Sequence, residues 1–335
     1  MSSIDSTKET IPWYVKLLTA LSGWMGAFFL TLFFGFLFNK LILDSPIAMS
    51  IVGSLLIFTA YRVLSGSIGD FFEHFALALS MTGQVMIIAS LLIHGDMSRW
   101  LALLAISIFQ ILLALWIPNY IHRVLTSFFA STTLYYLSVT IRDPYLYIVI
   151  LTGIVSWMWL QNPKEYNNPE RLRALSYGAL VSLVSIASFH MFNYYGSIFY
   201  TIHYHKLALI EPWMGELISG VILILVSDSI FRRYPNGTIS IRLFIVIGLS
   251  IWSMVSLLAH GVSMGIMIVV LGYINSNRLV TGLGIIALLS NLSAYYYFTE
   301  ITLLQKSAVL LAMGCTLLIG RYIMHRVVNE ESNHG

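Results

Sequence analysis

The chain has 335 residues, of which 58% are hydrophobic, 14% aromatic and only 10% charged, whereas about 25% of the residues in an average soluble domain are charged. This composition excludes an ordinary soluble domain and a disordered chain. The net charge of +3 is spread thinly, without the basic tract of a nucleic-acid-binding protein, so we expect no nucleic-acid partner.

Apolar runs long enough to cross a bilayer follow one another along the chain, bounded by Pro, Gly, Asn or charged residues. In chain order the predicted membrane helices are 13–38, 46–64, 75–93, 100–117, 120–139, 144–160, 174–191, 212–231, 241–258, 262–274, 279–297 and 301–324. They use about 240 residues and leave too few for a separate globular domain. We predict an all-α polytopic transmembrane helix bundle of about 12 helices, forming a single integral membrane domain over 1–335.

The tenth predicted helix, 262–274, is the weakest candidate for a full crossing. Thirteen residues reach about 20 Å, less than a hydrocarbon core of about 30 Å. The positive-inside rule nevertheless favours twelve crossings with both termini cytoplasmic. In that topology only five of the 18 Lys and Arg residues fall outside, namely Lys40, Arg99, Arg142, Lys206 and Lys306.

The most hydrophilic stretch, 161–173, divides the predicted helices into six and six. This arrangement is shared by transporters built from two halves, here 1–160 and 174–335 with a cytoplasmic linker, although no residue-level repeat is visible. The single cysteine, Cys315, excludes an internal disulfide and a Cys-based metal cluster. No phosphate-binding loop, HExxH or Gly-x-Ser-x-Gly motif is present, so we expect no cofactor.

Polar residues near the predicted cytoplasmic helix ends have local structural explanations. Asp228 precedes Arg232 by four residues, the spacing of an ion pair on one helix face. Asp70 and Glu73 stand where a carboxylate complements the positive end of a helix.

Gln84 and Gln110 lie at mid-span in different predicted helices, where we expect their side chains to hydrogen-bond one another.

Ionisable residues without such an explanation gather near the predicted outer helix ends, and an ionisable group inside a bilayer is a candidate functional site. The candidate ligand-binding residues are Glu216, His260, Glu300, Lys306, His203 and His205. The two histidines of the aromatic loop 192–211 are two residues apart, and a metal site there would need a third ligand from elsewhere, with His190, Glu211 and His260 as candidates. We therefore expect the two histidines to anchor the loop and predict no metal. A Glu216 to Lys306 ion pair lining an outward cavity is the sharpest hypothesis; snorkelling of Lys306 to the surface is the alternative.

Both ends of the chain resemble a known bacterial membrane family. The opening segment Pro12-Trp13-Tyr14-Val15-Lys16-Leu17-Leu18, followed by Gly23-Trp24, is similar to the start of the family called domain of unknown function 4401. The segment Tyr295-Tyr296-Tyr297, then Thr302-Leu303-Leu304, Lys306-Ser307 and Gly314, is similar to its C-terminal part. The resemblance implies a bacterial inner-membrane protein and draws attention to 300–307, but it implies no activity.

Three functions are compatible with these features. The first is a transporter or permease with a site between the helices, which predicts a water-accessible cavity. The second is a membrane-embedded enzyme acting on lipid or envelope substrates, which predicts that His203, His205, Glu216 and Lys306 converge at the outer face. The third is a non-catalytic assembly partner of other membrane proteins. In each case the lipid bilayer is the main partner.

Overall fold

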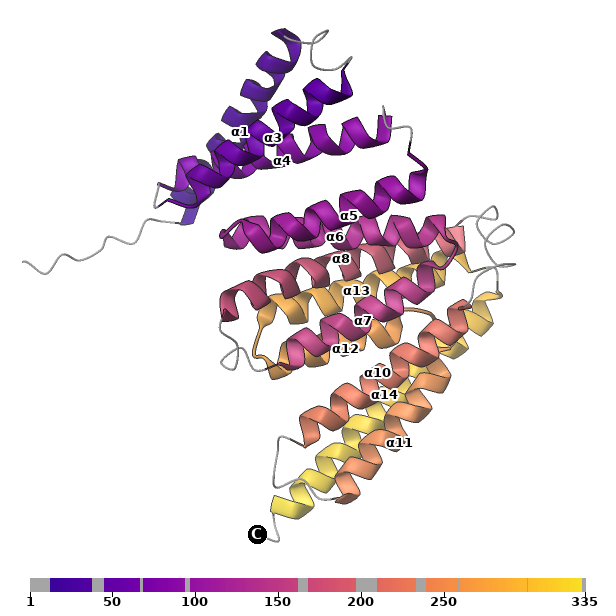
Figure 1. The fold of residues 1–335 in the computed structure, drawn as a ribbon. Helices are drawn as coiled ribbons and strands as arrows, with labels where there is room; N and C mark the ends of the chain where they lie inside the picture. The colour runs from indigo at the N-terminus through magenta and orange to yellow at the C-terminus, as the bar shows by residue number, and fades with distance from the viewer. Residues whose placement is uncertain are drawn as a thin grey trace, which may run out of the picture. The chain divides into compact units, whose positions relative to one another are not determined.

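The computed structural model describes residues 13–37, 45–66, 69–93, 97–161, 168–196, 210–232, 239–257, 259–299 and 301–332. Within these ranges the chain forms twelve helices (Figure 1). They are α1 (Trp13–Leu37), α3 (Pro46–Leu64), α4 (Asp70–Ile93), α5 (Arg99–Trp116), α6 (Tyr120–Thr140), α7 (Pro144–Leu160), α8 (Pro169–Gly196), α10 (Pro212–Phe231), α11 (Ile239–Ser256), α12 (Val262–Ile274), α13 (Arg278–Phe298) and α14 (Leu303–Ser332). The predicted all-α fold and helix number are confirmed.

Local signals explain why several helices begin where they do. Pro46, Pro144 and Pro212 each stand at the start of a helix, where the missing N–H of proline costs nothing. Ser45 caps α3 by accepting a hydrogen bond from the backbone N–H of Ala48 at 3.3 Å. These starts agree with the predicted ones to the residue.

Three helices extend at least five residues beyond the predicted apolar spans. α4 begins at Asp70 rather than at residue 75, α8 begins at Pro169, and α14 continues to Ser332. The reason is that hydropathy marks the part of a helix that lies in lipid, whereas backbone hydrogen bonding continues the helix into polar flanking sequence.

Six of the described helices are long and apolar enough to cross a membrane. They contain the spans Pro46–Leu64, Asp70–Leu92, Arg99–Trp116, Pro169–Phe192, Trp213–Phe231 and Arg278–Phe298. Shorter apolar segments, including Pro144–Leu160 and Val262–Ile274, lie between them in the chain. The protein is therefore a polytopic membrane protein embedded in a lipid bilayer.

The chain divides into two compact units, Met1–Arg123 and Val124–Gly335. In the first unit, α1 and α3 both pack against α4. Gly53 of α3 and Gly83 of α4 face one another so closely that a Cβ on either would lie 2.5 to 2.6 Å from the carbonyl oxygen of the other. This contact is the close helix approach that small residues permit in membranes.

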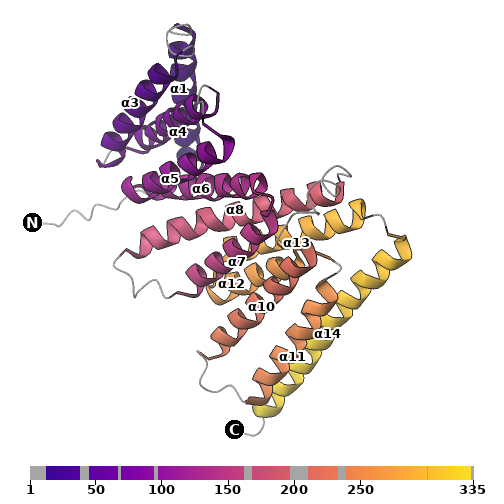
Figure 2. The same cartoon turned by 45° about the vertical axis from the view of Figure 1, so that its right-hand side comes forward.

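The second unit is built around the short helix α12, which packs against α13, α10 and α7. Three of its side chains, Met267, Ile268 and Leu271, are completely buried. α8 packs against α13 and α7, while α11 packs between α10 and α14, and Figures 1 and 2 both show α11 and α14 side by side. The expected six-plus-six halves stay a prediction; the boundary between the compact units falls inside α6, at Arg123.

Candidate functional site

The structure describes three of the six candidate ligand-binding residues, namely Glu216, His260 and Lys306. His203, His205 and Glu300 lie outside the described residues. Among the residues that are described, no group of three His, Cys, Asp or Glu side chains is placed to hold a metal ion.

Glu216 is a buried carboxylate in the second turn of α10. It lies four residues after Pro212, about 6 Å along the helix axis, and only 3% of its surface is exposed. Its Oε2 accepts a hydrogen bond from the backbone N–H of Gly261 at 2.7 Å, and its Oε1 accepts one from the N–H of Ser263 at 3.0 Å. Both carboxylate oxygens are therefore held by the backbone at the start of α12.

The start of α12 is shaped to receive this carboxylate. Gly261 is the N-cap of the helix and has φ +86°, a left-handed conformation that disfavours a side chain. The first N–H groups of a helix have no partner within it and carry a partial positive charge, so they bind an anion well. Here Glu216, supplied by α10, satisfies two donors that the 13-residue helix leaves open.

Polar side chains from two further helices complete this site. At the end of α11, the Ser256 hydroxyl lies 3.0 Å from the Ser263 hydroxyl. From α13, the completely buried Asn291 donates its Nδ2 hydrogen to the carbonyl oxygen of Gly261 at 2.9 Å. We call Glu216, Ser256, Gly261, Ser263 and Asn291 the Glu216 cluster.

One acceptor of the Glu216 cluster remains unused among the residues that the structure describes. The Asn291 Oδ1 atom is buried there without a hydrogen-bond partner. It lies close to Gly261, because a Cβ on that glycine would be 3.3 Å away from it. A buried acceptor without a donor costs free energy, so this atom is free to accept a hydrogen bond from a donor that comes within reach.

His260 lies next to the Glu216 cluster, one residue before Gly261 in the turn between α11 and α12, and its side chain is half-buried. Asn291 was not among the predicted residues. The available signal was an amide in the middle of an apolar helix, which is a polar group that must find a partner inside the bundle.

Lys306 is not part of the Glu216 cluster. Its Nζ donates a hydrogen bond to the backbone carbonyl of Tyr296 at 2.7 Å and lies 5.8 Å from the centre of the Tyr296 ring. No salt bridge joins Lys306 to Glu216 in the described parts of the chain, so the hypothesis of this ion pair was wrong. The cation instead binds at the C-terminal end of α13, where carbonyl groups attract positive charge.

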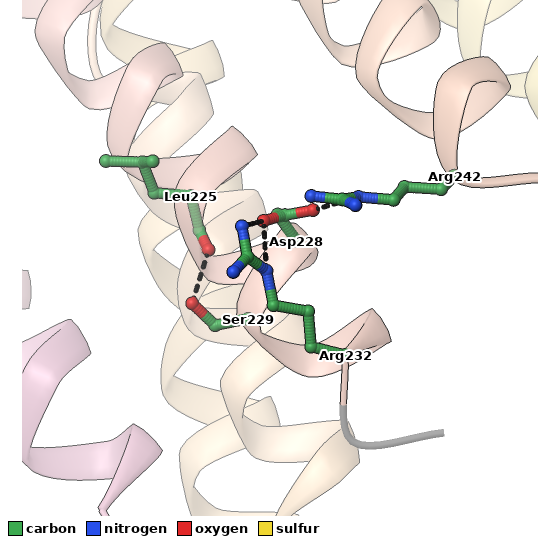
Figure 3. Close-up of polar contacts among 5 residues, drawn as sticks. All are labelled: Leu225, Asp228, Ser229, Arg232 and Arg242. Carbon is green, nitrogen blue, oxygen red and sulfur yellow. Dashed lines mark hydrogen bonds and ion pairs between the residues drawn. The ribbon is translucent and has the colours of Figure 1, made fainter. Parts of the chain in front are cut away.

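The predicted ion pair at the other end of α10 is confirmed, and a second arginine joins it. An Arg232 Nη2 to Asp228 Oδ2 distance of 2.8 Å joins residues one helical turn apart. Figure 3 shows a second arginine, Arg242 of α11, on the other oxygen of Asp228. Asp228 is thus neutralised locally and links α10 to α11, about 18 Å along the helix from Glu216.

The first unit contains a separate buried polar network around His122, a residue that sequence analysis missed. His122 Nε2 lies 2.9 Å from the Ser80 hydroxyl and 3.3 Å from Nε2 of Gln84. The predicted bond between Gln84 and Gln110 was wrong, because Gln84 turns to His122 and Ser80 instead. A histidine within the first turn of a predicted membrane helix was the available signal.

Asn119 connects this network to the start of α4. Its Nδ2 donates to Glu73 Oε1 at 2.7 Å, and its Oδ1 accepts from the N–H of His122 at 2.9 Å. The first unit also has an open groove of about 670 Å³ between α3 and α4, lined by Ser50, Ser54 and Ser90 together with apolar side chains. None of its lining residues is ionisable, so Glu216 remains the strongest candidate for chemistry.

Comparison with known proteins identifies the chain at the level of its family. The family model described as Domain of unknown function (DUF4401) matches residues 12–327. No curated protein and no solved structure matches the chain. The family resemblance of the two ends is therefore confirmed over almost the whole sequence, and this polytopic membrane protein belongs to the DUF4401 family.

Proposed function

We propose that this protein is a transporter or permease whose site is the Glu216 cluster. The observation that carries the proposal is the buried carboxylate of Glu216, bound to two backbone N–H groups at the start of α12, a helix of only 13 residues. Charged groups inside a membrane are costly and are characteristic of substrate and ion pathways.

The interruption of helical structure between α11 and α12 supports the same proposal. Secondary transporters bind substrates and coupling ions at interrupted helices, where helix ends present N–H and carbonyl groups to the ligand. Here the interruption presents the N–H of Gly261 to Glu216 and its carbonyl oxygen to Asn291. Side chains from α10, α11 and α13 meet at this one point of the chain.

The two other functions gain less from these contacts. An outer-face enzyme would bring Glu216 and Lys306 together, yet each has a different partner. An assembly partner needs no buried carboxylate. We further propose that the membrane is the bacterial inner membrane and that both termini are cytoplasmic, because only five of the 18 basic residues would then lie outside.

Cysteine accessibility tests the transport proposal without knowledge of the substrate. The sole cysteine, Cys315, is exposed on α14 and would first be replaced by serine. Single cysteines would then be introduced as Ser256→Cys and Ser263→Cys, which change one atom each. A charged, water-soluble methanethiosulfonate reagent would be applied to intact cells and to inverted vesicles. Met267→Cys, completely buried one turn further along α12, is the matched control.

Ser256 and Ser263 are completely buried in the structure, so labelling requires a state in which water reaches them. The proposal predicts that both cysteines react, from at least one side, much faster than Met267→Cys. A protein that inserts normally but reacts at neither position from either side, while Arg142→Cys on an exposed turn is labelled, would contradict a transport pathway at this site.

A further inference from the structure

We propose that Glu216 is a proton-binding site, at which the carboxylate exchanges one of its backbone hydrogen bonds for a bound proton and, once neutral, donates that proton in a hydrogen bond to Asn291 Oδ1. The inference rests on the proposed transport function and names the ligand of that site. It would make the state of α12 depend on proton binding.

The charged form of Glu216 is the one that its present hydrogen bonds require. Each carboxylate oxygen accepts a hydrogen bond from a backbone N–H, of Gly261 or of Ser263. No Lys, Arg or His side chain forms a salt bridge with Glu216 in the described ranges of the chain. The negative charge is therefore balanced by the two backbone N–H groups together with the hydroxyls of Ser263 and Ser256, and by no cation in the described ranges, which leaves it open to neutralisation by a proton.

The neutral form needs an acceptor, and Asn291 offers an unused one at the same glycine that Glu216 binds. A protonated carboxyl group has one O–H donor, and a donor needs a buried acceptor. Asn291 Oδ1 is buried and has no hydrogen-bond partner in the described structure, while the Nδ2 atom of the same side chain already binds Gly261. Glu216 and Asn291 thus hold the N–H and the carbonyl group of one left-handed glycine.

Proton binding at Oε2 would release the N–H of this glycine. Protonation converts COO⁻ and H⁺ to COOH, and the oxygen that carries the proton becomes a poor acceptor for a backbone N–H. The start of α12 would lose a charge-assisted hydrogen bond and part of its favourable interaction with an anion. A carboxylate that binds the helix when charged and releases it when neutral is a two-state element of the kind that coupled transport needs.

The other titratable groups around Glu216 are few. The turn before α12 contributes His260, and α7 contributes Tyr145, whose ring lies 3.4 Å from the Cβ that Gly215 would carry. α13 contributes Tyr295, which is buried. On α11 the charged residue is Arg242, which is bound to Asp228 at the opposite end of α10. His260 is thus the neighbour whose titration must be separated from that of Glu216.

Labelling with dicyclohexylcarbodiimide tests the proposal on the intact protein in membranes. This apolar reagent reacts with protonated carboxyl groups, and mass spectrometry of the peptides locates the adduct. We expect an adduct on Glu216 that decreases about tenfold for each pH unit above a single midpoint. Glu216→Gln should lose the adduct, and His260→Gln should retain the same pH dependence. Exposed Glu211 and the arginine-bound Asp228 provide internal controls.

Asn291→Leu removes the acceptor of the neutral form and should lower labelling at a given pH by about fivefold. Absence of the adduct on Glu216 at every pH, or labelling that does not vary with pH, would overturn the proton site. If Ser256→Cys and Ser263→Cys were still labelled in the accessibility experiment, the transport proposal would survive that result. Conversely, a pH-dependent adduct with inaccessible cysteines would contradict the transport pathway alone.

Discussion

Replacing Gly261 by alanine should destabilise the second unit, because this residue has a left-handed backbone and closely packed surroundings. A side chain at φ +86° costs about 1 to 2 kcal/mol. The new Cβ would also lie 2.6 Å from Asn291 Nδ2, so the amide must move and give up its hydrogen bond to Gly261, at about 1 kcal/mol. Together these terms give about 2 to 3 kcal/mol.

The free energy of unfolding of Gly261→Ala would be measured in detergent micelles by titration with SDS, followed by circular dichroism. Gly248→Ala in α11 is the matched control, since a Cβ there meets no atom within 4 Å and the change should stabilise the helix by up to about 1 kcal/mol. Adding Asn291→Ala to Gly261→Ala should recover the steric part, which appears as a coupling of about 1 kcal/mol in a double-mutant cycle.

Two results would refute this reasoning. If Gly261→Ala unfolded at the same SDS fraction as Gly248→Ala, the left-handed conformation and the contact with Asn291 would not constrain the start of α12. If the two substitutions Gly261→Ala and Asn291→Ala were strictly additive, the clash would not exist, and only the backbone term would remain.

Three further predictions concern other parts of the chain. Gly83→Ala should destabilise the first unit by about 1 to 3 kcal/mol in the same SDS assay, because its Cβ would lie 2.5 Å from the Gly53 carbonyl oxygen; unchanged stability would show that α3 and α4 separate freely. His122→Leu should cost about 1 to 3 kcal/mol, since Gln84 loses a buried partner, and a stabilised variant would contradict a structural role for this network. Alkaline phosphatase fused after Arg142 should be active and the same enzyme fused at the C-terminus inactive; the reverse pattern would invert the proposed topology.

Much of the fold could be predicted because each membrane helix satisfies its own backbone hydrogen bonds. Hydropathy and the prolines at 46, 144 and 212 therefore located helices without any knowledge of their neighbours. The ion pair of Asp228 with Arg232 was predictable for the same reason, because residues four apart on a helix always face the same side.

Contacts between helices could not be predicted in this way. Arg242 reached Asp228, and Gln84 turned to His122 rather than to Gln110, because helix rotation and packing decide which polar groups meet. Lys306 had Glu216 as a candidate charged partner in the sequence, yet its Nζ binds the Tyr296 carbonyl group at the end of α13, while Glu216 binds the start of α12.

The sequence by itself determined that this is a polytopic helical membrane protein of one family, because apolar length, proline positions and end motifs are local properties of the chain. Tertiary structure alone decided that the one buried carboxylate of α10 meets the start of α12. The N-terminal N–H groups of that 13-residue helix need an acceptor, and only packing brings Glu216 within 2.7 Å of Gly261.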